Sequence, residues 1–396
     1  MTATKCYLNA LGILCAAGDS GSAVAANLQT QRESLTFTDA YSDGRPLPLG
    51  LYRGGLPAIP LKSKKWNTRN NQFALAAIQQ IYQDVQSTLK SFGAHRVGVV
   101  IGTSTSGIAE SEMAIKHWSK TSELPAEFDY SFQEMGATAQ FVAQVLGIKG
   151  PSFGISTACS SGAKALASAR RLIRAGICDA VIAGGVDTLC HLTVRGFSSL
   201  EAVSDSRCNP FSKNRSGINI GEGAAIFLVT AEATGCELAG VGEGSDAHHI
   251  SAPDPTGDGA KRCMSAALVD GAITADEVDY INLHGTATKL NDQMEARAVE
   301  AVFGGKMLCS STKPFTGHTL GAAGAIEAGI CWLGLTGQSE LNIRPPVQLW
   351  DGVEDPELPR LRLVTAESKL DAPQRCALSN SFAFGGNNIS LLLRRI

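Results

Sequence analysis

Apolar runs that end at or near glycine alternate along this chain with segments of helical periodicity. The helical pattern is clearest at 70–89 and at 291–303. Strands that alternate with helices indicate an α/β fold whose sheets are covered on both faces. The opening segment has one lysine and a short apolar run, so we expect a first strand there and not a signal peptide. Further buried strands are predicted at 96–102, 179–185, 223–229 and 278–285.

The pattern of strand ends occurs twice. VVIGTSTSG (99–107) matches INLHGTATK (281–289), and STACSSGAKALASA (156–169) matches FTGHTLGAAGAIEA (315–328). Within the first half, the two motifs are about 20 residues farther apart than their counterparts are within the second half. We therefore expect an insertion in the first half, within 110–135. Two similar halves, 1–235 and 236–396, explain this better than unrelated domains. Chance similarity between Gly- and Thr-rich strand ends is the alternative.

Composition and charge narrow the function classes. The 396 residues are 44% hydrophobic and 18% charged, which is typical of a compact globular chain, and a net charge of −3 gives no general attraction to nucleic acid or anionic membranes. No apolar run approaches the length of a membrane span. The 11 cysteines are scattered without zinc-ligand spacing, so we expect reduced thiols, no metal and a cytoplasmic location.

Cys159 lies between a strand-like segment and a run of small residues. If a helix starts at Ser160, its unpaired N–H groups and dipole favour a thiolate, and a sharp strand-to-helix turn exposes the sulfur. A buried structural cysteine is the alternative on this stretch alone. His284 and His318 occupy corresponding strand ends in the second half. One histidine near a cysteine can activate it, and two can donate N–H groups to one carbonyl oxygen.

Two further segments carry candidate chemistry. Lys313 precedes His318 and Glu327 follows it, and a buried lysine there can orient a neighbour or shift its pKa, whereas a surface lysine does neither. In NSFAFGGNN (380–388), a Gly-Gly turn can offer backbone N–H groups to an oxyanion, and Phe384 can cover an apolar channel.

Five blocks resemble the β-ketoacyl-acyl-carrier-protein synthases of the type I/II elongating class. The resemblance runs nearly end to end and implies an α/β thiolase fold, in which two similar βαβαβαββ halves form a five-layered α-β-α-β-α core. It implies a decarboxylative Claisen condensation of malonyl carrier protein with a Cys-bound acyl chain, giving β-ketoacyl carrier protein, CO2 and free carrier protein. The blocks are STACSSG (156–162), CNPFSKNRSGINIGEGAAIFLV (208–229), HGTATKLND (284–292), STKPFTGHTLGAAGAIEA (311–328) and NSFAFGGNN.

The resemblance also assigns roles. Cys159 is the nucleophile, and His284 and His318 bind the malonyl thioester carbonyl during decarboxylation. Lys313 and Glu327 fix His318 and the local charge. The amides of Cys159 and Phe384 receive the oxyanion, and Phe384 gates the acyl chain. Thr286 and Thr288 bind the pantetheine arm, so no metal or soluble cofactor is needed.

Among the departures from the family pattern, three concern the predicted site, whereas Ser212 and Ser216 replace common aspartates without a catalytic implication. Ala287 stands where glycine or serine is usual between the two threonines, and Ala383 replaces the glycine before Phe384, a change expected to stiffen or redirect that loop. Thr105 aligns with a position beside the acyl pocket that often holds a larger aliphatic residue. A threonine there hints at an acyl chain that is longer or more polar than ordinary saturated chains.

The resemblance implies an acidic acyl carrier protein as partner. A basic stretch before an apolar helix also resembles the family segment that meets the carrier, and a solvated patch without a partner is the alternative; its residues are Lys62, Lys64, Lys65 and Arg69. The family is dimeric, either as a homodimer or with a cysteine-less chain-length-factor subunit. HGTATKLND is similar to polyketide and aryl-polyene members, although fatty acid elongation stays open. A chain-length-factor-like partner or a thiolase-type acyl-CoA enzyme are the other readings.

Overall fold

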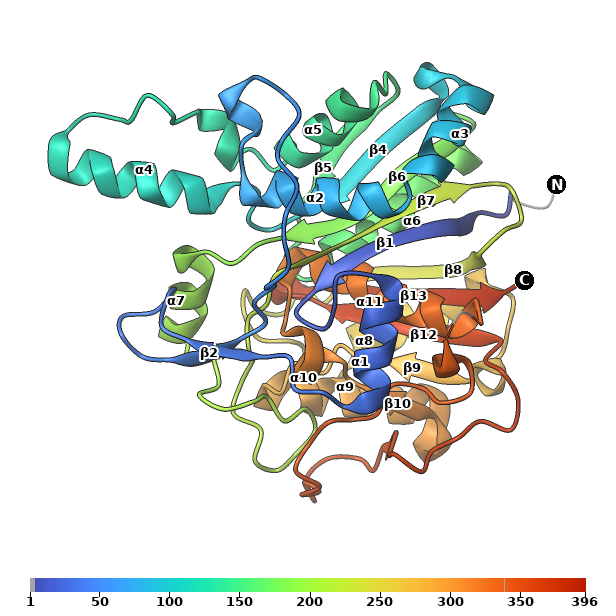
Figure 1. The fold of residues 1–396 in the computed structure, drawn as a ribbon. Helices are drawn as coiled ribbons and strands as arrows, with labels where there is room; N and C mark the ends of the chain where they lie inside the picture. Colours follow the sequence, from blue (N-terminus) through green and yellow to red (C-terminus); the bar gives the residue numbers. More distant parts are fainter. Residues whose placement is uncertain (1–3, 338) are drawn as a thin grey trace.

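Five strands of the first half form one part of a large sheet in the computed structural model, which describes residues 4–337 and 339–396. Their spatial order is β5-β4-β6-β7-β1 (Figure 1). β4 pairs in parallel with β5 and β6, whereas β7 is antiparallel to both β6 and β1. The strands are β1 (Tyr7–Cys15), β4 (Val97–Gly102), β5 (Ser152–Ile155), β6 (Ala180–Asp187) and β7 (Gly223–Thr230).

The second half repeats this arrangement strand for strand. Its order is β10-β9-β12-β13-β8, with the same pattern of parallel and antiparallel pairs. The strands are β8 (Cys236–Ser245), β9 (Tyr280–Asn282), β10 (Leu308–Ser310), β12 (Cys376–Phe382) and β13 (Asn387–Arg395), with β11 (Arg362–Leu363) at the edge. The repeated topology confirms the two similar halves expected from the sequence. We propose their boundary, at 235/236, in the connection between β7 and β8.

Helices cover both faces of each half and fill the space between them. α2 (Arg69–Gln80) and α5 (Ala137–Leu146) pack on the first half, while α8 (Asp258–Asp270), with α9 (Lys289–Phe303) against it, packs on the second. α6 (Ser161–Arg174) and α11 (Ala323–Leu335) lie in the middle, with α6 on β4 and β6 and α11 on β12 and β13. This is the expected five-layered α-β-α-β-α core (Figure 1).

The central layer depends on small residues. Every residue of α11 is buried, and α6 and α11 contact each other directly. A Cβ atom built on Gly162 of α6 would lie 2.9 Å from the Gly321 carbonyl oxygen and 2.9 Å from the Ala325 Cβ. The run of alanine, glycine and serine around Cys159 therefore lets the two middle helices approach closely.

α4 (Ile108–Thr121) extends away from these layers (Figure 1). Only Ser111 and Ala114 of its 14 residues are buried, while Met113, Ile115 and Trp118 are exposed by 67%, 51% and 52%. The helix lies where the sequence predicted an insertion in the first half. So much apolar surface on a projecting helix marks it as an interaction site.

Two predicted elements differ from the structure. The helix expected over 70–89 is two helices, α2 and α3 (Tyr82–Phe92), because Ile81 between them leaves helical geometry with φ −116° and ψ 18°. The strand expected over 278–285 is shorter, since β9 stops at Asn282 and the chain then turns into a loop. The pattern of hydrophobic residues continues through the helix break and through the end of the strand, so it predicts neither of them.

The remaining elements connect these layers. They are α1 (Gly21–Thr30), α7 (His191–Ser199), α10 (Lys313–Thr316) and the hairpin of β2 (Thr36–Thr38) and β3 (Leu47–Leu49). Among the described residues, no helix has the length and apolar character needed to cross a bilayer.

Candidate active site

Cys159 lies in a sharp turn between β5 and α6, as the sequence predicted. Ala158 has a φ of 52°, a left-handed conformation that is uncommon for residues other than glycine. The Ser160 hydroxyl donates to the Thr157 carbonyl at 2.8 Å, and the Ser161 hydroxyl accepts from the Thr157 amide at 2.9 Å. These bonds hold the sulfur at the amino end of α6, where it faces a cavity instead of bulk solvent.

Burial favours the protonated form of the Cys159 thiol. Burial raises the pKa of the thiol to about 12, and the positive charge of Lys313 lowers it by less. The Phe384 backbone N–H also lies at the sulfur and lowers the pKa. The cost of burying a thiolate thus exceeds the stabilisation that Lys313 provides, which disfavours the ionised sulfur expected at a helix start.

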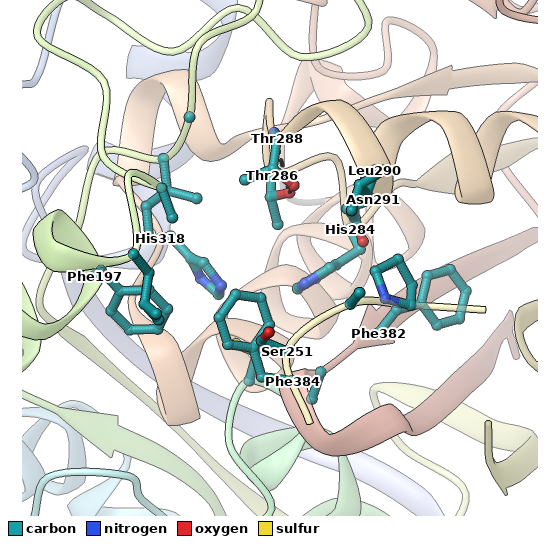
Figure 2. Close-up of a pocket in the computed structure, with 18 of the residues that line it drawn as sticks. Phe197, Ser251, His284, Thr286, Thr288, Leu290, Asn291, His318, Phe382 and Phe384 are labelled. Carbon is teal, nitrogen blue, oxygen red and sulfur yellow. Dashed lines mark hydrogen bonds between the residues drawn. The ribbon is translucent and has the colours of Figure 1, made fainter. Parts of the chain in front are cut away.

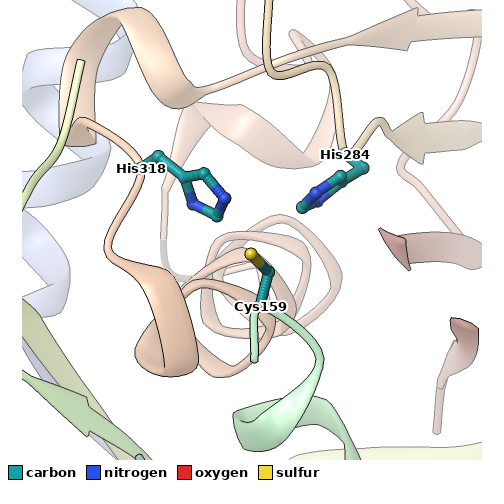
Figure 3. Close-up of side chains that lie close together, drawn as sticks. All are labelled: Cys159, His284 and His318. Atoms are coloured by element: carbon teal, nitrogen blue, oxygen red, sulfur yellow. The ribbon is translucent and has the colours of Figure 1, made fainter. Parts of the chain in front are cut away.

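Two imidazoles from the second half face this sulfur (Figure 3). The sulfur and one ring nitrogen from each of His284 and His318 all lie within 4.8 Å of one another. The two rings are 5.3 Å apart between centroids and nearly perpendicular, at 83°. Burial, and then the charge of Lys313, lower the pKa of both histidines well below the usual value, which favours the neutral form of both rings. A neutral imidazole keeps one N–H that it can donate to an oxygen.

Lys313 and Glu327 form a buried ion pair next to His284. The side chains of both are 2% exposed. The Lys313 ammonium donates to the Glu327 carboxylate and to the His284 carbonyl oxygen, and its nitrogen lies 3.4 Å from His284 Nδ1. Lys313 thus contacts His284 and acts on His318 through its charge alone, so the predicted fixing of His318 by this pair is corrected to a fixing of His284.

These contacts set the tautomer of His284. An ammonium group offers only donors, so Nδ1 acts as acceptor and the ring proton is on Nε2. The three side chains have the ligand types of a zinc site. However, a dication at Nε2 would have to displace that proton while Lys313 opposes added positive charge. The arrangement suits binding an oxygen that gains negative charge better than holding a metal ion.

A cavity of about 470 Å³ leads to this group (Figure 2). All six residues predicted for nucleophile, carbonyl binding, gating and pantetheine line it: Cys159, His284, Thr286, Thr288, His318 and Phe384. The Phe384 ring packs against Phe197 of α7, with 5.4 Å between centroids. Gly385 and Gly386 behind it have φ of 80° and 74°, which explains the Gly-Gly pair. Ala383 is extended at φ −100°, so alanine there causes no backbone strain.

Known protein families match the chain in both halves. The model described as "Beta-ketoacyl synthase, N-terminal domain" matches residues 57–234, and "Beta-ketoacyl synthase, C-terminal domain" matches 235–339. The chain is 34% identical over 357 residues to 3-oxoacyl-[acyl-carrier-protein] synthase 2 of Staphylococcus aureus, covering 85% of this chain and 84% of that protein. The chain belongs to the β-ketoacyl synthase family. It is an acyltransferase of the Cys-His-His ketosynthase type.

Solved ketosynthase structures share the whole fold. A chain of the ketosynthase ApeO in complex with its chain length factor ApeC, from Xenorhabdus doucetiae, superposes with a TM-score of 0.93 at 41% identity. The match covers 99% of this chain and 98% of that one. The ishigamide ketosynthase/chain length factor gives a TM-score of 0.88 at 26% identity over the full length of both chains.

The two threonines predicted to bind pantetheine lie together in the cavity wall. The hydroxyls of Thr286 and Thr288 are 2.9 Å apart. Ala287 between them has a φ of 65°, a left-handed conformation that favours glycine, which is one of the two residues usual at this position. Thr105 does not line this cavity, and its hydroxyl donates to Asp187 at 2.8 Å. That hydroxyl is already hydrogen-bonded within the fold, and a place for Thr105 beside the acyl chain stays a prediction.

The predicted docking patch divides into two parts. Lys62 and Lys64 are exposed and Lys65 is half-buried beside Trp66, with its ammonium 4.5 Å from the indole centroid. Arg69 instead makes a two-point ion pair with the fully buried Glu222, at 2.9 and 2.5 Å. Its charge is neutralised within the fold, so only the three lysines remain as a free basic surface.

Sequence reasoning missed two neighbours of the site. Glu295 of α9 is fully buried and accepts the amides of His284 and Gly285 at 2.8 and 2.7 Å, so it fixes the loop that carries His284. Glu295 follows His284 by 11 residues in HGTATKLNDQME, and placing this segment on a helix could have predicted that its side chain turns back to the histidine loop. Phe197 comes from a helix without any motif, and no pattern in the chain pointed to it.

Proposed function

We propose that this chain is the condensing subunit of a carrier-protein-dependent chain-elongating system. The observation that supports it best is one thiol facing two neutral imidazoles in a cavity lined by the pantetheine threonines. In the first half-reaction, the Cys159 sulfur attacks the acyl thioester on a carrier protein. The acyl C–S bond to pantetheine breaks, and the proton of Cys159 passes to the departing thiolate, with a neighbouring imidazole as carrier. The products are acyl-Cys159 and free carrier protein.

The second half-reaction uses both histidines. The carbonyl oxygen of a malonyl thioester accepts N–H groups from His284 and His318, and the bond to the malonyl carboxylate breaks with loss of CO2. The electron pair forms an enolate, which the two N–H groups stabilise. Its carbon attacks the acyl-Cys159 carbonyl, the bond to sulfur breaks, and Cys159 takes up one proton. The amides of Cys159 and Phe384 hold the oxyanion formed during this attack.

The substrates arrive on phosphopantetheine, and the proposal needs no other cofactor or metal. Thr286 and Thr288 contact the pantetheine arm within the cavity. Lys62, Lys64 and Lys65 attract the acidic carrier protein, each with only a small contribution, so that they act together. The eleven cysteines are all free in the described structure, as a reducing compartment keeps them, and we place the enzyme in the cytoplasm.

A second subunit of the same fold is the expected partner. The exposed apolar residues of α4 and the free edge of β5 lie on the same half of the molecule, and both are surfaces that need covering. Two of the similar solved structures are ketosynthases paired with chain length factors. We therefore favour a heterodimer with a chain-length-factor-like subunit, in an aryl-polyene or polyketide type of elongation, over a homodimer.

One reconstitution tests the proposal. The chain, with and without a chain-length-factor-like partner, is incubated with acyl and malonyl carrier proteins. CO2 and β-ketoacyl carrier protein are measured by mass spectrometry. We expect both products from the wild-type protein, no condensation product from Cys159→Ala, and loss of CO2 release from His318→Ala. A His318→Ala variant that releases CO2 at the wild-type rate contradicts the role of that histidine.

A further inference from the structure

Asp187 is a fully buried carboxylate that the mechanism above does not use. It ends β6 and is 0% exposed. None of the described lysine, arginine or histidine residues forms a salt bridge with it. A carboxylate without a cation in the interior is stabilised only if donors surround it, so the groups that it binds are held firmly in place.

One oxygen of Asp187 binds the loop after β4. Oδ1 accepts the hydroxyls of Thr103 and Thr105 at 2.6 and 2.8 Å and the amides of Ser104 and Thr105 at 2.9 Å each. In the internal repeat, Thr103 and Thr105 correspond to the cavity threonines of the second half. The same strand-end loop thus lines the cavity in the second half and is closed by a carboxylate in the first.

The other oxygen reaches across to the second half. Oδ2 accepts the amide of Gly321 at 2.6 Å, besides a shared bond from the Ser104 amide at 2.9 Å. Gly321 lies three residues after His318, and its segment leads directly into α11. A Cβ atom at Gly321 would be 2.7 Å from Asp187 Oδ2, so the contact admits no side chain. Asp187 therefore connects the β4 loop to the segment that carries His318.

We propose that Asp187 is a positioning residue for the decarboxylation half-reaction. This inference rests on the proposed function. Asp187 fixes the distance of the His318 segment from the first half, and therefore from Cys159, through the Gly321 amide. The enolate forms only when both imidazoles reach one oxygen, whereas transfer of the acyl chain to Cys159 needs less from His318. Loss of the Gly321 bond is thus expected to affect the two half-reactions unequally.

Asp187→Asn breaks this bond selectively. The four donors at Oδ1 hold the amide oxygen of asparagine in that position, so the NH2 group faces the Gly321 amide, donor against donor. CO2 release from malonyl carrier protein then falls by about tenfold to a hundredfold in kcat, as expected for a misplaced reacting group, while its KM changes little. Acyl loading of Cys159, followed by intact mass, stays near the wild-type rate. The matched control is Asp179→Asn, just before the other end of β6, where the carboxylate pairs with Arg96 at the surface.

Two results overturn the inference: CO2 release by Asp187→Asn at the wild-type rate, or an equal loss of loading and decarboxylation, which indicates general damage to the fold. If Asp187→Asn does not fold, Gly321→Ala is used, because its methyl group would lie 2.7 Å from both Asp187 Oδ2 and the Ser104 amide nitrogen and so separates the Gly321 segment from them while the charge remains. It must show the same unequal loss, and equal rates contradict the proposal. A wild-type protein that neither loads nor releases CO2 contradicts the proposed function itself, whereas an active wild type with an equally active Asp187→Asn contradicts this inference alone.

Discussion

The buried pair of Lys313 and Glu327 offers a double-mutant test of how the site is built. Lys313→Met removes the cation and leaves the Glu327 carboxylate in the interior with no counter-charge. Glu327→Gln leaves the ammonium of Lys313 against a neutral amide. The double variant removes both charges and keeps nearly the same volume. If the pair acts as one unit, the sum of the unfolding free energies lost in the two single variants must exceed the loss in the double variant.

The magnitude follows from burial. Both side chains are 2% exposed, and removing one partner of such a pair costs about 3–5 kcal/mol of unfolding free energy. The double variant leaves no unpaired charge, so we expect it to recover most of that loss and to show a coupling of about 3 kcal/mol. Burial raises the pKa of Glu327 to about 7 even with Lys313 present, so the unpaired carboxyl of Lys313→Met resists ionisation further. The unfolded carboxyl is the same in both proteins, so its ionisation cancels in the comparison. The extra deficit of Lys313→Met relative to wild type is therefore expected to grow only above about pH 7, where the wild-type carboxyl ionises and the unpaired one does not.

Urea unfolding followed by tryptophan fluorescence at pH 5, 6.5 and 8 measures these costs, with CO2 release as a second readout. Activity must not recover in the double variant, because the contact of Lys313 with His284 is lost in it. A loss of unfolding free energy in the double variant that equals the sum of the two single losses within about 0.5 kcal/mol would refute the coupling. Full recovery of CO2 release in the double variant would refute the role given to Lys313.

Three further predictions concern stability and docking. Burial raises the pKa of Glu295 to about 7, so the neutral form is favoured in the fold and about 3 kcal/mol of stability is lost as pH rises from about 4.5 to 7. Glu295→Gln should remove that slope in urea titrations, and an unchanged slope contradicts the assignment. Replacing Lys62, Lys64 and Lys65 together by glutamate should raise the KM for carrier-bound substrate, most strongly at low salt, with unchanged kcat; a KM that is the same at all salt concentrations disproves the docking patch. Gly162→Val should lower the unfolding free energy by about 3 kcal/mol or more through overpacking of the middle layer, and a wild-type urea midpoint would show that the helices can separate.

Much of the site was visible in the sequence because the duplication repeats its geometry. Corresponding strand ends placed Cys159, His284 and His318 at one edge, and the run of small residues predicted the close approach of α6 to its repeat partner. These signals are local in the chain, and the repeat shows which of them belong together. The elbow at Ala158 was likewise predictable, since a sharp turn must join a short strand to a helix that begins at Ser161.

Long-range pairing explains what was missed. Arg69 belonged to a basic stretch by its neighbours in sequence, but its partner Glu222 lies 153 residues later in the chain. Lys313 was assigned to the nearer histidine, yet the fold brings the ammonium to the carbonyl and ring of His284. The ionisation of Cys159 could not be predicted from a helix start, because the cost of burial depends on everything that surrounds the sulfur.

The most direct test of the account is the site of covalent acylation. The purified protein is incubated with acyl carrier protein and no malonyl carrier protein, then analysed by intact mass and by peptide mapping. The account predicts one acyl adduct on the peptide that contains Cys159, and none with Cys159→Ala. An adduct on another residue, or an adduct of equal size and rate in Cys159→Ala, would contradict it.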